Sequence, residues 1–175
     1  MTQEQKFRPL DEYQMINACA ARFSTADYRF CNFYYRHDHE ADLFVISKAR
    51  YATEIEVKLS LSDWRADFKK SKHSTNKYIK FFYYAVPASL VDKAPPEIDS
   101  RYGIISVHQS EYGDVYTRMV KPAEQMPCAK VPKGIICKAF LSSYYRNIDL
   151  RRANSTLMNE VHRLRQLIPE NGVNA

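Results

Sequence analysis

Residues 42–70 read DLFVISKARYATEIEVKLSLSDWRADFKK and carry the clearest signals of secondary structure in the chain. Residues 42–47 form a short apolar run, and residues 51–59 alternate between apolar and polar side chains with the period of a strand. The three residues KAR between them predict a hairpin turn. After these strands the pattern changes to the period of a helix. Ser60 or Ser62 would cap this helix. Asp63 lies in its first turn and lysines lie near its end, an order of charges that the helix dipole favours. The stretch therefore predicts strand, strand, helix.

The rest of the chain extends this pattern into a mixed sheet. We predict a helix over 9–23, strands over 28–35, 81–86, 102–107 and 115–120, polar turns at 36–41 and around Gly113, and a proline-containing loop over 122–134. A long helix over 138–167 carries Leu150, Leu157, Met158, Val161, Leu164 and Leu167 on one side. The predicted fold class is α/β, a mixed central β-sheet flanked by helices with a C-terminal helical extension. The predicted units are a domain over 1–137 and a basic helix and tail over 138–175.

Composition narrows the classes of protein. The 175 residues carry 26 Lys+Arg against 20 Asp+Glu, a formal charge of +6 that favours a polyanionic partner. No apolar run is long enough to span a bilayer, and the polar N-terminal residues lack a secretory signal. Four widely separated cysteines are typical of reduced thiols in a cytoplasmic protein. Only four glycines are present, too scattered for a P-loop or a dinucleotide-binding motif.

The two predicted strands bring chemically useful side chains together. Glu56 and Lys58 point to one face of their strand and Val57 to the other, and the hairpin lets Asp42 approach that face. Mg²⁺ prefers oxygen ligands, which Asp42, Glu56 and the Val57 carbonyl would supply, with Glu54 as a further candidate. Lys58 would orient the attacking water or neutralise a phosphate. The pattern indicates metal-dependent phosphodiester hydrolysis, although an acid and a lysine two residues apart are also common on a solvated strand face.

A basic segment follows the predicted site. Between residues 58 and 80 there are seven Lys or Arg against two Asp. Such a helix would neutralise a DNA backbone, and we predict phosphate contacts from Arg65, Lys69, Lys70, Lys72 and Lys77.

Two other segments have less specific interpretations. His37, Asp38 and His39 predict a solvated turn near the active face, with a phosphate contact or a zinc ligand as alternatives, because no distant third ligand is evident. The aromatic run at 81–84 predicts sheet core rather than a platform for bases.

The order of motifs resembles a known family. DLFVIS, EIEVKLSLSDWRADFKKSKH, KFFYYAVP, YGIISV and GDVYTRMVKPA, over residues 41–123, resemble the MmcB-like branch of the PD-(D/E)XK nuclease superfamily. The resemblance implies a restriction-endonuclease-like core with Asp42 and Glu56 as metal-binding acids, Lys58 as catalytic lysine and Glu12 as an additional metal ligand. Glu40 departs from the arginine often found there, and the C-terminal helix has no counterpart.

The expected function is that of a Mg²⁺- or Mn²⁺-dependent deoxyribonuclease in DNA repair, recombination or a mobile-element context, with DNA as partner and a homodimer as one possible state. The alternatives are a non-cleaving DNA-binding accessory protein of a repair complex on the same fold, and a structural subunit that docks through the C-terminal helix. Endonuclease and exonuclease action are equally consistent with these residues.

Overall fold

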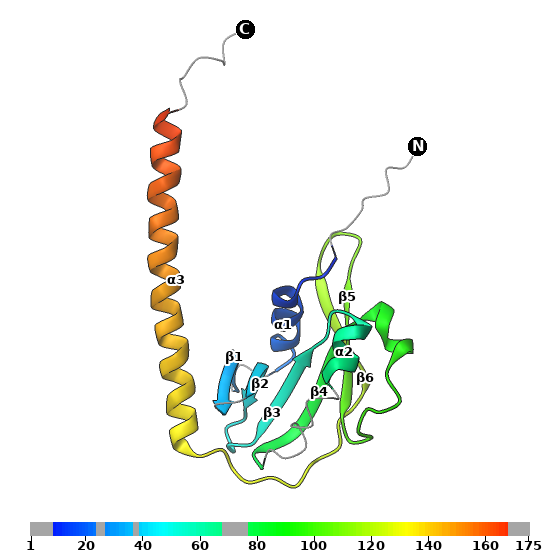
Figure 1. The fold of residues 1–175 in the computed structure, drawn as a ribbon. Helices are drawn as coiled ribbons and strands as arrows, with labels where there is room; N and C mark the ends of the chain where they lie inside the picture. Colours follow the sequence, from blue (N-terminus) through cyan, green and yellow to red (C-terminus); the bar gives the residue numbers. More distant parts are fainter. Residues whose placement is uncertain (1–8, 24–26, 37–38, 68–76, 168–175) are drawn as a thin grey trace, which may run out of the picture. The chain divides into compact units, whose positions relative to one another are not determined.

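The computed structural model describes residues 9–23, 27–36, 39–67 and 77–167, with side chains through residue 163 (Figure 1). Its elements in chain order are α1 (Glu12–Ala20), β1 (Tyr28–Arg36), β2 (His39–Ile46), β3 (Ala52–Val57), α2 (Leu61–Asp67), β4 (Ile79–Pro87), the 3₁₀ helix η3 (Ala88–Lys93), β5 (Gly103–Gln109), β6 (Val115–Lys121) and α3 (Lys133–Leu167). The predicted α/β class, a mixed sheet with flanking helices and a long C-terminal helix, is confirmed. The chain forms two compact units, Met1–Ile136 and Cys137–Ala175. In the described part of the chain, no helix combines the length and apolar content needed to cross a membrane.

The six strands form one sheet in which spatial order follows chain order, β1 to β6. The first three strands are antiparallel neighbours. The connection through α2 returns the chain in the same direction, so β4 lies parallel to β3, and β5 lies parallel to β4. The last two strands, β5 and β6, pair as an antiparallel hairpin.

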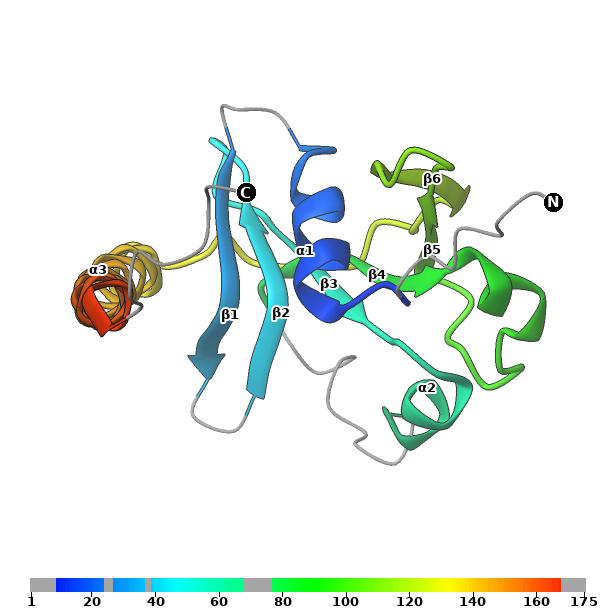
Figure 2. The ribbon, with the colours of Figure 1, turned by 90° about the horizontal axis from the view of Figure 1, so that it is seen from above.

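One face of the sheet packs against α1. This helix begins at a capping box, in which the Asp11 carboxylate accepts a hydrogen bond from the Gln14 N–H and the Gln14 side-chain oxygen accepts one from the Asp11 N–H. The buried core on this face combines three α1 side chains with seven from the sheet: Met15, Ile16, Cys19, Leu43, Val45, Ile55, Val57, Ala85, Ile105 and Val107. Figure 2 shows α1 and α2 on opposite sides of the sheet.

The opposite face carries an aromatic layer. Trp64 of α2 is fully buried and its ring lies 5.6 Å from that of Tyr84, while Phe82 and Tyr102 have ring centroids 4.4 Å apart. Residues of β3 alternate between the two faces, so Ile55 and Val57 face α1. The charged residues between and after them therefore project into the aromatic layer, where they are buried.

Both predicted hairpins are present. The turn after β2 is closed by hydrogen bonds from the Arg50 N–H to the Ser47 carbonyl (2.8 Å) and from the Ser47 N–H to the Tyr51 carbonyl (3.0 Å). In the β5–β6 turn Gly113 has a φ of 91°, a conformation that favours glycine.

Several predicted boundaries were wrong. The first helix, predicted over 9–23, runs from Glu12 to Ala20, and two further differences have a clear physical reason. The polar turn predicted at 36–41 overlaps β2, which begins at His39. The long helix begins at Lys133 rather than 138, because Pro132 starts it: the Pro132 carbonyl accepts hydrogen bonds from the Ile135 and Ile136 N–H groups. A proline is compatible with a helix start, since its fixed φ suits the first turn.

The second unit consists of most of α3 and the residues beyond it. Side chains of Leu150, Leu157, Met158 and Val161 are exposed along the helix. Leu164 and Leu167, predicted on the same side, lie beyond the described side chains. An ion pair between Arg163 and Glu160 (2.6 Å) joins neighbouring turns of the helix.

Gly103 allows a close approach that a larger residue would prevent. A Cβ atom at this position would lie 2.4 Å from the ring of Tyr83 and 2.7 Å from the Ala123 nitrogen. We expect Gly103→Ala to lower the free energy of unfolding by about 1–3 kcal/mol. Urea unfolding followed by fluorescence of Trp64, the one tryptophan, measures this. Gly134→Ala is the matched control, because a Cβ there meets no atom within 4 Å; an equal loss in both variants would contradict the steric explanation.

Candidate functional site

Asp42 lies where β2 and β3 separate. The paired residues run from Ile46↔Ala52 to Leu43↔Ile55, and one step further along β2 and β3 places Asp42 opposite Glu56. At this point the Asp42 carboxylate accepts a hydrogen bond from the Val57 N–H (2.7 Å). The hairpin thus brings Asp42 beside the end of β3, next to Glu56 and Lys58.

The surroundings of Asp42 disfavour its negative charge. Burial raises the pKa of Asp42 to about 6, opposed by the Val57 N–H and by Lys58, with Glu12 and Glu40 raising it further. Glu12, the exposed first residue of α1, therefore lies close enough for its charge to act on Asp42. A cation placed among these carboxylates would reverse the effect and favour the ionised form.

Lys58 is held by two carboxylates from different elements. Its ammonium donates to Glu56 Oε2 (3.2 Å) and to Asp67 Oδ1 (3.1 Å), and all three side chains are buried. The Tyr84 hydroxyl donates to the other Asp67 oxygen (2.8 Å). Burial alone would lower the pKa of Lys58, but the charges of Glu56 and Asp67 outweigh it and the pKa is raised. Lys58 is therefore a fixed positive charge at neutral pH.

A second set of side chains adjoins this one. Glu54 is fully buried, with Oε2 accepting a hydrogen bond from the Tyr35 hydroxyl (2.9 Å) and Oε1 lying 2.5 Å from His39 Nε2. The same nitrogen lies 3.8 Å from Glu56 Oε1. Among the described residues, His39, Glu54 and Glu56 form the group of three potential metal ligands whose ligand atoms all lie within 4.8 Å of one another. Asp42 is outside that group.

His39 is not the solvated turn residue that the sequence predicts. It is the first residue of β2, and its ring points toward Glu54 and Glu56 because β2 begins earlier than predicted. His37 and Asp38 lie outside the described residues.

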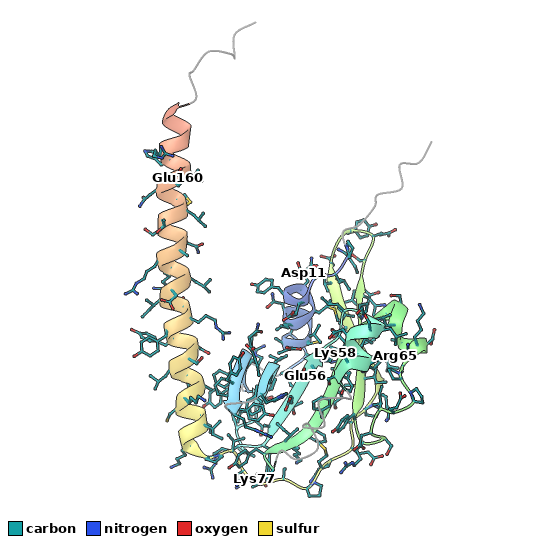
Figure 3. All side chains as sticks on the ribbon, in the orientation of Figure 1. Asp11, Glu56, Lys58, Arg65, Lys77 and Glu160 are labelled. Carbon is teal, nitrogen blue, oxygen red and sulfur yellow. The ribbon has the colours of Figure 1, made fainter. Side chains whose placement is uncertain are left out.

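The predicted DNA contacts are spread along the sheet. Arg65 is exposed on α2, whose buried side chains are Trp64 and Asp67. Lys77 is exposed just before β4, near the start of β3, because Ala52 pairs with Ile79. Figure 3 shows Lys77 at the end of the sheet away from Glu56 and Lys58. Lys69, Lys70 and Lys72 lie outside the described residues.

Sequence reasoning missed the partners of the buried charges. Two acids in a strand that also carries core residues require buried partners. The sequence thus predicts that partners exist, but not that His39 is one of them. Asp67 had a weak signal, since it lies three residues after Trp64 and so shares its buried helix face. Tyr35 and Tyr84 had none, because the chain contains 13 tyrosines.

Comparison with known proteins bears on the fold alone. No protein-family model matches the chain, and no curated protein sequence matches it. The structure is similar to that of SPO1766, a protein of unknown function from Silicibacter pomeroyi, with a TM-score of 0.61 and 16% sequence identity. The similarity covers 85% of this chain and 96% of that one. The two chains therefore share the fold over nearly the whole of SPO1766.

The contact between Lys58 and Asp67 predicts a large loss of stability when it is removed. Asp67→Asn leaves Lys58 and Tyr84 buried without the carboxylate they share, and we expect unfolding free energy to fall by about 3 kcal/mol. Denaturant unfolding measures the loss. Asp63→Asn, on the exposed side of the same helix, should cost less than about 1 kcal/mol. Similar losses in both variants would mean that the buried contact contributes little.

The raised pKa of Asp42 predicts a pH dependence. Unfolding exposes a carboxyl that ionises near pH 4, whereas the folded one ionises near pH 6. Between these values the folded state binds more protons, so the contribution of Asp42 to stability falls as pH rises. Relative to Asp42→Asn, the metal-free protein should lose on the order of 2–3 kcal/mol between pH 4 and pH 7. Parallel stability curves for the two proteins would refute the shift.

Proposed function

We propose that this chain is a metal-dependent phosphodiesterase that cleaves DNA, on a fold of the PD-(D/E)XK type. The observation that carries the proposal is the hydrogen bond from Val57 to Asp42, which brings Asp42 beside Glu56 and Lys58 where the strands part. The motifs quoted above, in their order, support the family placement. Similarity to SPO1766 supports the fold and no more.

In this proposal the acidic residues and Lys58 have different roles. Asp42 and Glu56 would hold Mg²⁺ or Mn²⁺, with the Val57 carbonyl and Glu12 as further candidate ligands. The fit rests on the donor set, hard carboxylate oxygens around an acid whose pKa is raised toward 6. Such an ion lowers the pKa of bound water and stabilises charge on the phosphate. Lys58, kept protonated by Glu56 and Asp67, serves as a positive charge toward the phosphate rather than as a base.

Arg65 and Lys77 define how DNA would be held. Both are exposed cations, one on α2 beside the site and one at the far end of β3 and β4. Contacts to phosphate at separated points fix the orientation of a nucleic acid without reading its sequence.

Removing the charge of Glu56 should abolish cleavage. With supercoiled DNA and Mg²⁺ or Mn²⁺, we expect Glu56→Gln to lose at least about 100-fold in cleavage rate while DNA binding stays within about twofold, because the loss removes transition-state stabilisation. EDTA should have the same effect on the unaltered protein. Gel electrophoresis of the products and fluorescence anisotropy of labelled DNA measure the two quantities.

The control is Lys77→Ala, far from the acids. It should leave the cleavage rate of bound DNA unchanged and reduce the salt dependence of binding by about one counterion. Full cleavage by Glu56→Gln would refute the site. Salt-sensitive binding with no cleavage in the unaltered protein would favour the second candidate, a non-cleaving DNA-binding accessory protein. The observation on its side is that Glu56 and Lys58 are buried and bound to each other.

A further inference from the structure

Three side chains beside the proposed site, His39, Glu54 and Glu56, converge on one point; we refer to them as the His39 cluster. The Tyr35 hydroxyl binds Glu54 Oε2 and the Lys58 ammonium binds Glu56 Oε2. The other oxygen of each carboxylate, Oε1, faces His39 Nε2, at 2.5 Å for Glu54 and 3.8 Å for Glu56. One imidazole nitrogen and two carboxylate oxygens thus share a small volume.

The spacing of these atoms suits a first-row divalent ion. Ligand atoms bound to one such ion at about 2.0–2.2 Å lie about 3.0–3.5 Å from each other. The two distances from Nε2, 2.5 and 3.8 Å, lie on either side of that range. Because the three ligand atoms all lie within 4.8 Å of one another, a small movement of the imidazole would bring both distances closer to that range. A nitrogen ligand with two oxygens favours a transition ion over Mg²⁺, which prefers oxygen alone.

Tyr35 orients two members of the His39 cluster. Its hydroxyl fixes Glu54, and its ring meets the His39 ring edge-on at 5.4 Å. Tyr35 is itself held in place, because its ring stacks on the ring of buried Phe44 with 4.7 Å between the centroids. Metal sites commonly have such outer groups that hold the ligands in place.

The charge of the surrounding cluster also favours a cation. Glu54, Glu56, Asp67 and Lys58 are all buried. These four side chains carry a formal charge of two negative. Buried charges are costly unless balanced, and one divalent ion would neutralise this set.

We propose that His39, Glu54 and Glu56 form a binding site for a divalent transition-metal ion; it shares Glu56 with the position beside Asp42 but does not include Asp42. The ion would enter past His39, whose side chain is 13% exposed, whereas Glu54 is fully buried. The proposal does not depend on cleavage of DNA.

The test uses Mn²⁺ with the full-length, EDTA-treated protein and no DNA. Mn²⁺ is chosen because exposed Cys31 and Cys137 would compete for zinc. Loss of the free-ion electron paramagnetic resonance signal gives the affinity, and electron spin-echo modulation by ¹⁴N reports a coordinated imidazole. The variants are His39→Gln and Glu54→Gln, with His108→Gln and Asp42→Asn as controls.

We expect ¹⁴N modulation in the unaltered protein and in both controls, its loss in His39→Gln, and at least about tenfold weaker binding in His39→Gln and Glu54→Gln. Absence of modulation in the unaltered protein, its persistence in His39→Gln, or loss of the ion in Asp42→Asn alone would overturn the inference. The last result would leave the proposed nuclease site intact. Trp64 fluorescence checks that each variant is folded. If His39→Gln unfolds, the test rests on the ¹⁴N modulation of the unaltered protein and on the Mn²⁺ affinity of Glu54→Gln compared with that of Asp42→Asn.

Discussion

The buried charges of β3 determine how the neighbouring elements pack around the site. Glu56 and Lys58 project into a layer of aromatic side chains, where an isolated charge would cost several kcal/mol. Each neighbouring element supplies a partner: α2 brings Asp67, β4 brings Tyr84, and β1 and β2 bring Tyr35 and His39 to Glu54. The short helix α2 must therefore dock where Asp67 reaches Lys58, and Trp64 fixes it there.

Stability alone does not account for these charges. Replacing buried ion pairs by apolar side chains of similar volume is often neutral or stabilising by about 1–4 kcal/mol. The α1 face of the same strand, with Ile55 and Val57, shows that an apolar solution packs well in this sheet. By this general tendency, a wholly apolar β3 is expected to be at least as stable, and the buried carboxylates therefore point to a chemical role at this face.

Local patterns in the sequence were sufficient to predict the fold. The site was predicted less completely, because it depends on contacts between residues far apart in the chain. The change from a period of two to a helical period after Lys58 placed β3 and α2, and turn residues placed both hairpins. Pro132 was misinterpreted because a proline fits a loop and a helix start equally well. His39 was misplaced because polar sequence predicts a turn, whereas pairing with β1 and the burial of Glu54 hold it in a strand. No short pattern encodes a partner fifteen residues away.

The protonation of Lys58 constrains any chemistry at this face. A general base works best with a pKa near the working pH, whereas Glu56 and Asp67 raise the pKa of Lys58 above its ordinary value. Burial raises the pKa of Asp42 to about 6, and a neighbouring cation would lower it. In the proposed function, with a metal ion bound at the acids, Lys58 would keep its proton while it stabilises negative charge on the phosphate. If the proposed function is correct, the place of Lys58 between Glu56 and α2 gives it an electrostatic role rather than one in proton transfer.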